Sequence, residues 1–415
     1  MKKKWIALLG SALMLGTGLA GKTIVALADE NQKNKSVACA AEYTENAKNA
    51  VNTAKNGVNL QIKAKSAYLI DYATGTVIYS ENEKTHLPIA SMCKIMTLLL
   101  SFEAIDAGII DLNEEITVSE RAASMGGSQV FLEANAKYPV KELIKSIVVC
   151  SANDSCVAMA EKIAGNEEAF IDKMNERAKQ LGANDTLFAN CTGLPKEPQY
   201  SCAKDVALML KALLSHKEYF EYGKVWLDKF QHPEGRFTEI TNTNKLVRFY
   251  EGCDGGKTGF TNQAGFCLAA TAKRNNMRVI SVVIGEENSK NRFDDVRSMF
   301  DYAFANYTMT PIVEGGVALE QIAMVDGGKN KTVALCAERS CFSFAKRGEK
   351  PNITVETHLN TLRAPVEKGD RVGELIVYKD NVEIDRVPLI SLESVEKANI
   401  FDRFRDVANG WNARS

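Results

Sequence analysis

Three short motifs in this chain bring together residue types that can perform nucleophilic catalysis and bind an anion. They are Ser91-Met92-Cys93-Lys94, Ser151-Ala152-Asn153 and Lys257-Thr258-Gly259. A serine beside a lysine supplies a nucleophile and a base. A hydroxyl and a carboxamide two positions apart can pass a proton and hold a substrate amide. A lysine among small residues can hold an anionic group close to the backbone.

The Lys257 motif lies in the string Asp254-Gly255-Gly256-Lys257-Thr258-Gly259-Phe260 and occurs once in the chain. Glycines in a strand let the backbone of a ligand approach closely. This composition suits a site that holds an anionic, extended substrate against the edge of a sheet. The alternative is a glycine-rich loop with a solvated lysine, and the motif alone does not decide between the two.

The Ser91 motif differs from the other Ser-x-x-Lys sequences in its surroundings. The pattern occurs four times, at Ser91, Ser201, Ser343 and Ser394. Only at Ser91 does it begin a deeply apolar helical segment, which runs over 95–100. Side chains three positions apart share one face of a helix. Burial disfavours the charged form of a lysine, which can then serve as a base for the neighbouring hydroxyl.

The Ser151 motif lies at a break between two apolar helical stretches. The same pattern occurs at Ser80 and Ser289, and a simple helix cap explains any single copy. The order and spacing of the three motifs are more specific than each motif alone. Ser151 follows Ser91 by about 60 residues, and Lys257 follows about 100 residues later.

Hydrophobic periodicity predicts the elements that must position these motifs. In chain order they are a hairpin over 66–79, a helix from Ser91, mostly helical structure over 140–215, strands over 255–260, 264–272 and 278–284, and a helix whose apolar face runs from Phe293 to Tyr307. This order predicts an α/β (α+β) domain over 61–311, in which helices cover an antiparallel sheet.

A second, all-β domain is expected over 312–390, because short alternating segments separated by turn residues follow Pro311. Residues 391–415 then form an amphipathic tail helix with one apolar face, made of Ile400, Phe401, Phe404, Val407, Ala408 and Trp411. This tail either lies on a membrane surface or packs against the β domain or a partner.

The first residues indicate an export signal over 1–28, with lysines before an apolar run and a small-residue cleavage site at Ala26-Leu27-Ala28. Cleavage nearer Ala20 and a retained membrane anchor are the alternatives. A polar, flexible leader over 29–60 follows. Removing the signal takes away four lysines and no acidic residue, which shifts the formal net charge from −1 to −5. This charge gives no support to nucleic-acid binding.

The ten cysteines show no disulfide framework and no Cys-x-x-Cys pair, and most lie in apolar stretches. We therefore expect mostly small buried hydrophobic residues, with Cys336 and Cys341 as the best candidates for a disulfide. The four histidines show no metal-ligand spacing. No metal or organic cofactor is expected.

With the three motifs in this order, the chain resembles the low-molecular-mass penicillin-binding proteins that are serine-type D-alanyl-D-alanine carboxypeptidases. The resemblance covers roughly residues 60–410 and includes the β domain with its closing amphipathic segment. Four further strings carry it: Met125-Gly126-Gly127-Ser128-Gln129-Val130-Phe131-Leu132, Asn153-Asp154-Ser155, Gly193-Leu194-Pro195 and Thr243-Asn244-Lys245-Leu246. It implies a β-lactamase/transpeptidase-like fold for the first domain.

The resemblance implies acyl transfer on peptidoglycan stem peptides that end in D-Ala-D-Ala. Ser91 would attack the carbonyl between the two D-alanines, and Lys94 would take its proton. Ser151 and Asn153 would relay a proton to the leaving D-alanine, and Asn153 would also hold the substrate backbone. The backbone N–H groups of Ser91 and Phe260 would form the oxyanion hole. Water would then hydrolyse the acyl-enzyme.

The same resemblance places the substrate's terminal carboxylate beside the third motif. Lys257 would keep the site electropositive, Thr258 would hydrogen-bond the carboxylate, and Gly259 belongs to the same substrate-binding strand. Arg292 resembles a family arginine near the carboxylate, and a solvated residue at a helix start is the alternative. β-Lactam antibiotics are implied as covalent inhibitors. The implied location is the outer face of the cytoplasmic membrane or the cell wall.

Other functions remain open at this point. Class A β-lactamases carry a Glu-x-x-Leu-Asn loop after the second motif, but no such string follows Ser151 and residues 184–193 contain no glutamate. Another serine acyl hydrolase, such as an esterase, would use the same scaffold. A D,D-endopeptidase is not separable by sequence, and a non-catalytic wall-binding protein is opposed by three intact motifs. Phe260, where relatives often differ, should tune the rate, and Cys93 is expected to pack rather than react.

Overall fold

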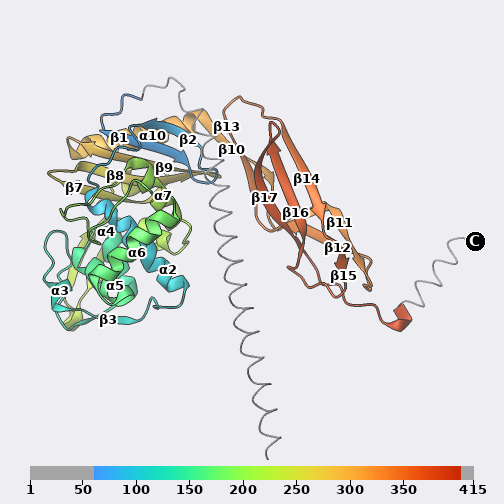
Figure 1. Cartoon of the computed structure of the whole chain (residues 1–415), viewed down its shortest axis with the longest axis horizontal. Coiled ribbons are helices and arrows are strands. Elements are labelled where there is room, and N and C mark those ends of the chain that lie inside the picture. Colours follow the sequence, from blue (N-terminus) through green and yellow to red (C-terminus); the bar gives the residue numbers. More distant parts are fainter. Residues whose placement is uncertain (1–59, 403–415) are drawn as a thin grey trace, which may run out of the picture. The chain divides into compact units, whose positions relative to one another are not determined.

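The computed structural model describes residues 60–402. The expected export signal, nearly all of the leader and residues 403–415 of the expected tail helix lie outside these residues. The prediction of a helix is wrong for 391–399: Ser391 ends a strand, Val395 forms a β-bridge with Val366, and helical structure begins only at Ile400. The described chain forms two compact units, one ending at Asp301 and the other beginning at Tyr302, with Asn275–Met277 grouped with the second (Figure 1). No helix in the described part is long and apolar enough to cross a membrane.

A five-stranded sheet in the order β2-β1-β9-β8-β7 forms the centre of the first unit. Its strands are β1 (Ser66–Asp71), β2 (Val77–Glu81), β7 (Cys253–Thr261), β8 (Gly265–Arg274) and β9 (Met277–Glu286). β1 pairs antiparallel with β2 and β9, and β7 pairs antiparallel with β8. The predicted hairpin and the three predicted strands are confirmed. Because β7 lies at the edge of the sheet, one side of its backbone is open to an extended ligand.

Helices cover both faces of this sheet. The helices and 3₁₀ turns of this unit are η1 (Ala90–Cys93), η2 (Pro233–Gly235), α2 (Lys94–Asp106), α3 (Glu120–Ala123), α4 (Val140–Val149), α5 (Asn153–Ala164), α6 (Glu167–Gln180), α7 (Ala203–Leu213), α8 (Tyr219–Gly223), α9 (Leu246–Phe249) and α10 (Ser289–Asn306). α7 packs on β1 and β8. α10 lies against β9, where the Ser281 hydroxyl is 3.5 Å from the sulfur of Met299.

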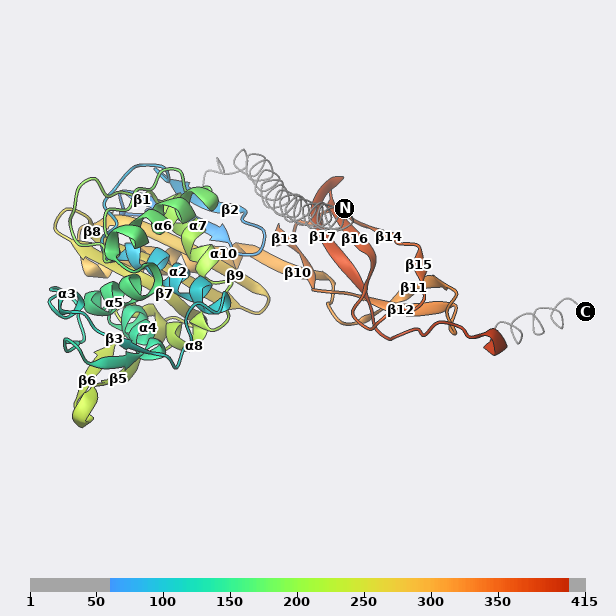
Figure 2. The same ribbon diagram turned by 60° about the horizontal axis from the view of Figure 1, so that its bottom comes forward.

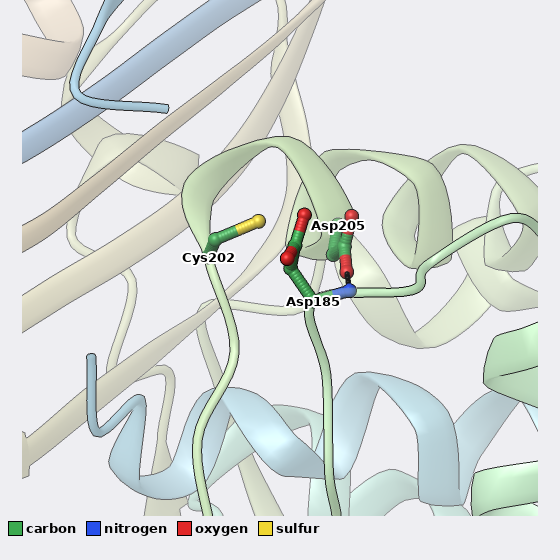
Figure 3. A group of neighbouring side chains, drawn as sticks. All are labelled: Asp185, Cys202 and Asp205. Carbon is green, nitrogen blue, oxygen red and sulfur yellow. Dashed lines mark hydrogen bonds between the residues drawn. The ribbon is translucent and has the colours of Figure 1, made fainter. Parts of the chain in front are cut away.

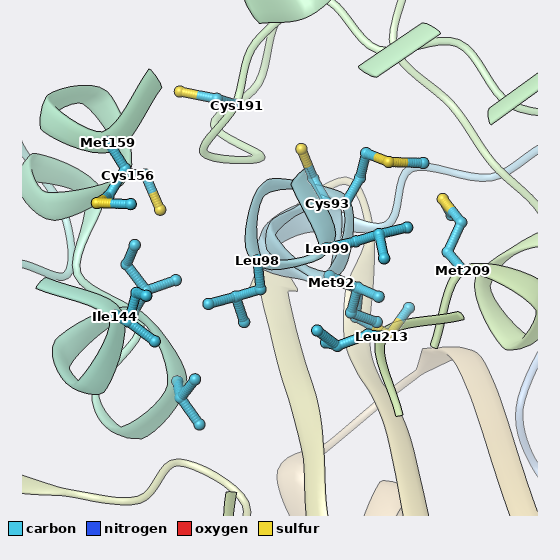
Figure 4. Packing of buried hydrophobic residues seen from close by; sticks show 14 of the residues in the cluster. Met92, Cys93, Leu98, Leu99, Ile144, Cys156, Met159, Cys191, Met209 and Leu213 are labelled. Atoms are coloured by element: carbon cyan, nitrogen blue, oxygen red, sulfur yellow. The ribbon is translucent and has the colours of Figure 1, made fainter. Parts of the chain in front are cut away.

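α2 runs through the middle of the main hydrophobic core. Its residues from Lys94 to Leu99 are all buried, and a helix segment of this kind is stable only when neighbours surround it. Leu98 points toward Ile144 of α4, and Leu99 points toward Met209 of α7 (Figure 4). The residue that begins α2, Lys94, is therefore held in place by packing on all sides.

Residues 140–215 are mostly helical, as predicted, and contain α4 to α7, but residues 181–202 form a loop between α6 and α7. Glycines and prolines interrupt the helical periodicity there, because they favour turns and disfavour a continued helix. The break between α4 and α5 is also sharp. Ser151 occupies this break with a φ of 67°, in the left-handed region that side chains seldom adopt.

Two small two-stranded sheets complete the first unit. β3 (Glu115–Thr117) pairs with β4 (Lys137–Pro139), and β5 (Leu227–Gln231) pairs with β6 (Phe237–Thr241). Figure 2 shows the β5–β6 hairpin projecting from the helical side of this unit.

The second unit is built from strands, as predicted for the region after Pro311. They are β10 (Tyr307–Val313), β11 (Ala318–Asp326), β12 (Thr332–Ala337), β13 (Cys341–Lys346), β14 (Ile353–Leu359), β15 (Leu362–Arg363), β16 (Arg371–Lys379) and β17 (Val382–Ser391). Six of them form one sheet, in the order β14-β16-β17-β12-β11-β15. Cys336 and Cys341 are buried free thiols, so the structure contains no disulfide between them.

Candidate active site

Ser91 and Lys94 meet at the junction of η1 and α2. Lys94 Nζ lies 3.0 Å from Ser91 Oγ, and the lysine side chain is completely buried. The α-helix itself begins at Lys94, so the expectation that Ser91 lies on the same α-helix is corrected: Ser91 belongs to the preceding 3₁₀ turn. In a 3₁₀ turn, side chains three positions apart lie directly above one another, which brings the two groups together.

A loop residue that sequence reasoning did not single out holds the lysine. The backbone carbonyl of Thr192 accepts a hydrogen bond from Lys94 Nζ. The loop is fastened to the catalytic helix because Thr97 Oγ1 donates to the Cys191 carbonyl at 2.7 Å and Cys93 Sγ donates to the Asn190 carbonyl at 3.1 Å. Burial raises the pKa of Cys93 to about 12, so its thiol stays protonated and its role is packing, as expected.

Gly193 lies directly against the nucleophile. Its φ is +81°, and a Cβ at this position would lie 2.0 Å from the Ala90 carbonyl oxygen and 2.8 Å from the Ser91 nitrogen. Only a residue without a side chain permits this contact. The string Gly193-Leu194-Pro195 was noted as similar to the family, and its geometric purpose is this approach to Ser91.

Gly193→Ala is therefore expected to displace Ser91 and to lower the free energy of unfolding by about 2 kcal/mol or more. Gly182→Ala is the matched control, because Gly182 also has a positive φ, of +76°, but has open space around it. Gly182→Ala should lower the free energy of unfolding by about 1 kcal/mol and leave the catalytic rate unchanged. Urea unfolding and the rate of penicillin labelling measure the two effects. Equal losses in both variants would show that contact with Ser91 is not the reason.

Ser151 and Asn153 reach the site from the break between α4 and α5. Both side chains are buried, and Ser151 Oγ and Asn153 Oδ1 have no hydrogen-bond partner among residues 60–402. Asn153 Nδ2 donates to the Gly126 carbonyl at 2.7 Å. Buried polar atoms are nearly always paired, so unpaired oxygens beside strained backbone are typical of groups that a substrate completes.

The residue after this motif, Asp154, has a structural purpose that sequence reasoning missed. Its carboxylate accepts hydrogen bonds from the backbone nitrogens of Val130 and Leu132, both at 3.1 Å. These bonds fix the loop whose Gly126 carbonyl holds Asn153. The acid was visible in the sequence, but bonds to backbone N–H groups leave no sequence signal.

The third motif lies on β7, which packs directly on η1. A Cβ at Gly259 would lie 2.5 Å from the Ile89 carbonyl oxygen and 3.2 Å from Ala90 Cβ, so the glycine allows the strand to touch the segment that carries Ser91. Lys257 is 2% exposed, which rules out the alternative of a solvated loop lysine. Its Nζ lies 3.3 Å from the Thr258 carbonyl oxygen.

Burial, together with the charge that Lys94 can carry, lowers the pKa of Lys257 to about 7. The lysines of the first and third motifs are neighbours because β7, which carries Lys257, packs on the η1 segment that leads into Lys94. The second motif is close as well: Asn153 and Leu194 both lie within 4 Å of a Cβ placed on Gly127, and Leu194 follows Gly193, the glycine that contacts Ser91. The structure thus brings all three motifs to one place.

The low pKa of Lys257 makes a prediction about stability. The unfolded chain holds this proton up to the ordinary lysine pKa of 10.5, whereas the folded chain releases it at about 7. Wild-type stability should therefore rise as pH rises between these values. Lys257→Met should raise the melting temperature by about 5 °C near pH 6, and by less near pH 9.5, while activity falls. Scanning calorimetry at the two pH values measures this, and an equal gain at both would contradict it.

Thr258, Phe260 and Arg292 surround the same strand. Alternation along β7 places Thr258 and Phe260 on the opposite face from Lys257; Thr258 is buried and Phe260 is half exposed, with its ring stacked on Phe266 at 4.2 Å. Arg292, from α10, is 9% exposed and so is not a solvated helix-start residue. Its Nη1 donates to the Gly259 carbonyl at 3.2 Å, and burial lowers its pKa to about 10.

One group of side chains within residues 60–402 has the spacing of metal ligands. The donor atoms of Asp185, Cys202 and Asp205 lie within 4.8 Å of one another (Figure 3). Asp205 Oδ2 already accepts from the Asp185 nitrogen at 2.7 Å and from Thr186 Oγ1 at 2.9 Å, and Asp185 Oδ1 contacts His86 Nε2 at 2.9 Å. Burial also raises the pKa of the Cys202 thiol to about 12. These hydrogen bonds therefore hold the loop over 181–202 in place, and we do not assign a metal ion to this group.

Comparison with protein families gives two matches. The model described as D-alanyl-D-alanine carboxypeptidase matches residues 49–288, and the model described as penicillin-binding protein 5, C-terminal domain, matches residues 307–397. The first covers all three motifs, and the second falls on the all-β unit.

Individual relatives agree with these matches. D-alanyl-D-alanine carboxypeptidase DacF of Bacillus subtilis is 39% identical over 359 residues, covering 86% of this chain and 92% of the relative. DacC of Escherichia coli is 34% identical, covering 83% and 87%. Among solved structures, penicillin-binding protein 5 of Haemophilus influenzae is 29% identical with a TM-score of 0.63, covering 81% of this chain and 98% of the other. PBP3 of Streptococcus pneumoniae is 28% identical with a TM-score of 0.66, covering 80% and 99%.

Proposed function

The chain belongs to the peptidase S11 family of D-alanyl-D-alanine carboxypeptidases, and from this membership we propose how its residues perform the reaction. Its activity is that of a serine D,D-carboxypeptidase, which removes the terminal D-alanine from peptidoglycan stem peptides. The observation that carries the residue assignment is the 3.0 Å contact between Ser91 Oγ and the fully buried Lys94 Nζ.

Acylation begins with proton transfer from Ser91 to Lys94. In its neutral form, the lysine can donate one N–H to the Thr192 carbonyl and direct its lone pair at the Ser91 hydroxyl. Ser91 Oγ then forms a bond to the carbonyl carbon between the two D-alanines. The backbone N–H groups of Ser91 and Phe260 stabilise the oxyanion, an effect of a few kcal/mol for such donors. Gly259, which precedes Phe260, contacts the η1 segment that contains Ser91. This contact supports the assignment of the two N–H groups to one oxyanion hole.

Departure of D-alanine requires a proton on its nitrogen as the C–N bond breaks. Ser151 Oγ is the group that passes this proton on from Lys94, since it is buried and has no other partner in the described chain. Asn153 holds the substrate backbone with its carboxamide. Water then attacks the ester at Ser91, and the proton path runs in reverse.

The terminal carboxylate of the substrate lies beside Lys257 and Arg292. An anion favours the protonated form of a neighbouring lysine, so substrate binding restores the charge that burial removes from Lys257. Thr258 supplies a hydrogen bond along the open edge of β7. KM for a carboxylate substrate therefore increases as pH rises above about 7, the pKa of free Lys257.

Family membership also indicates binding of β-lactams and action on peptidoglycan outside the cytoplasm. We infer that residues 1–28 direct export, that 29–60 form a leader, that 61–311 are the catalytic domain and that 312–390 are the β domain. We also infer that the amphipathic end of the expected tail over 391–415, from Ile400 onward, attaches the enzyme to the outer face of the cytoplasmic membrane. Deleting residues 400–415, which leaves the buried Val395 and its β-bridge to Val366 in place, should then release the protein from anionic and neutral vesicles alike. Unchanged binding would contradict the attachment.

Release of D-alanine from diacetyl-L-lysyl-D-alanyl-D-alanine tests the activity. The protein should liberate one D-alanine per peptide, and a β-lactam added beforehand should block the reaction. Absence of D-alanine release would contradict carboxypeptidase function. Cleavage of cross-linked dimers without release from the linear peptide would instead indicate an endopeptidase.

A further inference from the structure

A cavity of about 300 Å³ borders the catalytic groups, and no step described above uses it. Its wall includes Arg121 and Met125, Glu167 and Glu168 at the start of α6, and Leu194 and Lys196 from the loop over 181–202. A space of this size is at the lower end of the range for small-molecule sites in proteins. It accommodates an amino-acid side chain.

The cavity and the active site share walls. Thr192 lines the cavity, and its backbone carbonyl holds Lys94. A Cβ placed on Gly127 would lie 2.8 Å from Asn153 Nδ2 and 3.7 Å from Leu194 Cδ2. Leu194 and Asn153 are thus separated by little more than the backbone of Gly127. A substrate side chain that branches from the backbone near Asn153 therefore has a short path into the cavity.

The geometry around the nucleophile decides which half of the substrate lies nearest. β7 approaches the nucleophile through the contact of Gly259 with Ala90, and the loop approaches it through the contacts of Gly193 with Ala90 and Ser91. The terminal carboxylate is assigned to the β7 side, beside Lys257 and Arg292. The acyl half, whose backbone is assigned to Asn153, lies near Leu194 in the cavity wall, because both residues lie within 4 Å of a Cβ placed on Gly127.

The charged residues that line the cavity determine which ligand groups it can bind. Arg121 Nε donates to Glu167 Oε1 at 2.6 Å, so these two groups neutralise each other. Glu168 and Lys196 form no ion pair within residues 60–402. The remaining wall is mostly apolar, with Met125 and Leu194 among its residues. One unpaired carboxylate, one unpaired ammonium and an apolar lining match a short alkyl chain that ends in both an ammonium and a carboxylate.

We propose that this cavity binds the side chain of the residue that precedes the two D-alanines, and that it favours a zwitterionic side-chain terminus over a purely cationic one. Lys196 pairs with the side-chain carboxylate, and Glu168 pairs with the side-chain ammonium. The proposal rests on the carboxypeptidase function assigned above. It gives the enzyme a preference for stem peptides with a diamino dicarboxylic acid at position three.

Two peptides that differ by one carboxylate test the preference. They are N-acetyl-X-D-Ala-D-Ala with X either meso-diaminopimelate, linked through its L-centre, or L-lysine, each with a free side-chain amine. Neither contains the preceding acidic residue of a stem peptide, so its carboxylate cannot account for a difference. We expect kcat/KM to be about tenfold higher for the diaminopimelate peptide, as for other charge-assisted contacts.

Charge-neutralising variants separate the two contacts. Lys196→Gln should bring the ratio of the two kcat/KM values close to one, whereas Glu168→Gln should lower both values and leave the ratio above one, since both peptides carry the ammonium. Lys173→Gln and Asp172→Asn, exposed on α6 and outside the cavity wall, are the matched controls and should retain wild-type values.

The outcomes distinguish this proposal from the carboxypeptidase assignment. If neither peptide releases D-alanine, the assigned activity is wrong and the proposal is lost with it. If both peptides release D-alanine with equal kcat/KM, or if Lys196→Gln keeps the wild-type ratio, the activity stands and the pocket assignment is wrong.

Discussion

Ser91→Ala is expected to lower D-alanine release by about ten-thousand-fold or more, because no other group on the site can form the acyl-enzyme. The hydroxyl lies 3.0 Å from the amine that takes its proton, and alanine removes both the nucleophile and the proton. Folding should be retained, since Ser91 is only partly buried and its side chain contributes little to the core. Measuring D-alanine by a coupled oxidase assay gives the rate, and the melting temperature verifies the fold.

Ser343→Ala is the matched control. Ser343 begins another Ser-x-x-Lys sequence, lies on β13 of the second unit and has a hydroxyl with no partner in the described chain. This variant should keep the wild-type rate. A Ser91→Ala enzyme with substantial residual activity would assign the nucleophile elsewhere.

Lys94→Met is expected to slow acylation by about a thousandfold, within the range for loss of a general base. Methionine nearly matches the shape of the lysine stem, so the buried site at the start of α2 should remain filled. The Thr192 carbonyl then loses its donor. Stopped-flow or gel-based labelling with a fluorescent penicillin measures the acylation rate directly.

Lys94→Arg distinguishes two possible roles of Lys94: acting as a base and supplying a positive charge. Arginine keeps the charge and its donors but does not give up its proton in proteins. If Lys94 acts as a base, the arginine variant should be as slow as Lys94→Met. Substantial activity in Lys94→Arg with low activity in Lys94→Met would show that charge, rather than proton transfer, is what the site needs.

Periodicity and motif order predicted most of the fold. The strand-like runs over 66–79 and over 255–284 predicted the strands of the central sheet, and β1, β8 and β9 are buried along most of their length. The apolar run after Ser91 predicted a helix surrounded by its neighbours, which α2 is. Local signals of this kind are strong when burial is uniform along an element.

The details that shape the site depend on contacts distant in sequence. The Thr192 carbonyl approaches Lys94 across 98 residues, and the loop that carries it lies in a region expected to be helical. The 3₁₀ turn at Ser91 and the left-handed backbone of Ser151 are imposed by packing and not by propensity. The pKa of Lys257 depends on Lys94, far away in the chain. Single-sequence patterns contain none of this information.

Mass spectrometry of the penicillin adduct tests the central claim most directly. After incubation with benzylpenicillin and proteolysis, the protein should gain the mass of one penicilloyl group, on the peptide that contains Ser91, and Ser91→Ala should gain none. An adduct on another serine, or equal labelling of the Ser91→Ala protein, would contradict the assignment of Ser91 as the nucleophile.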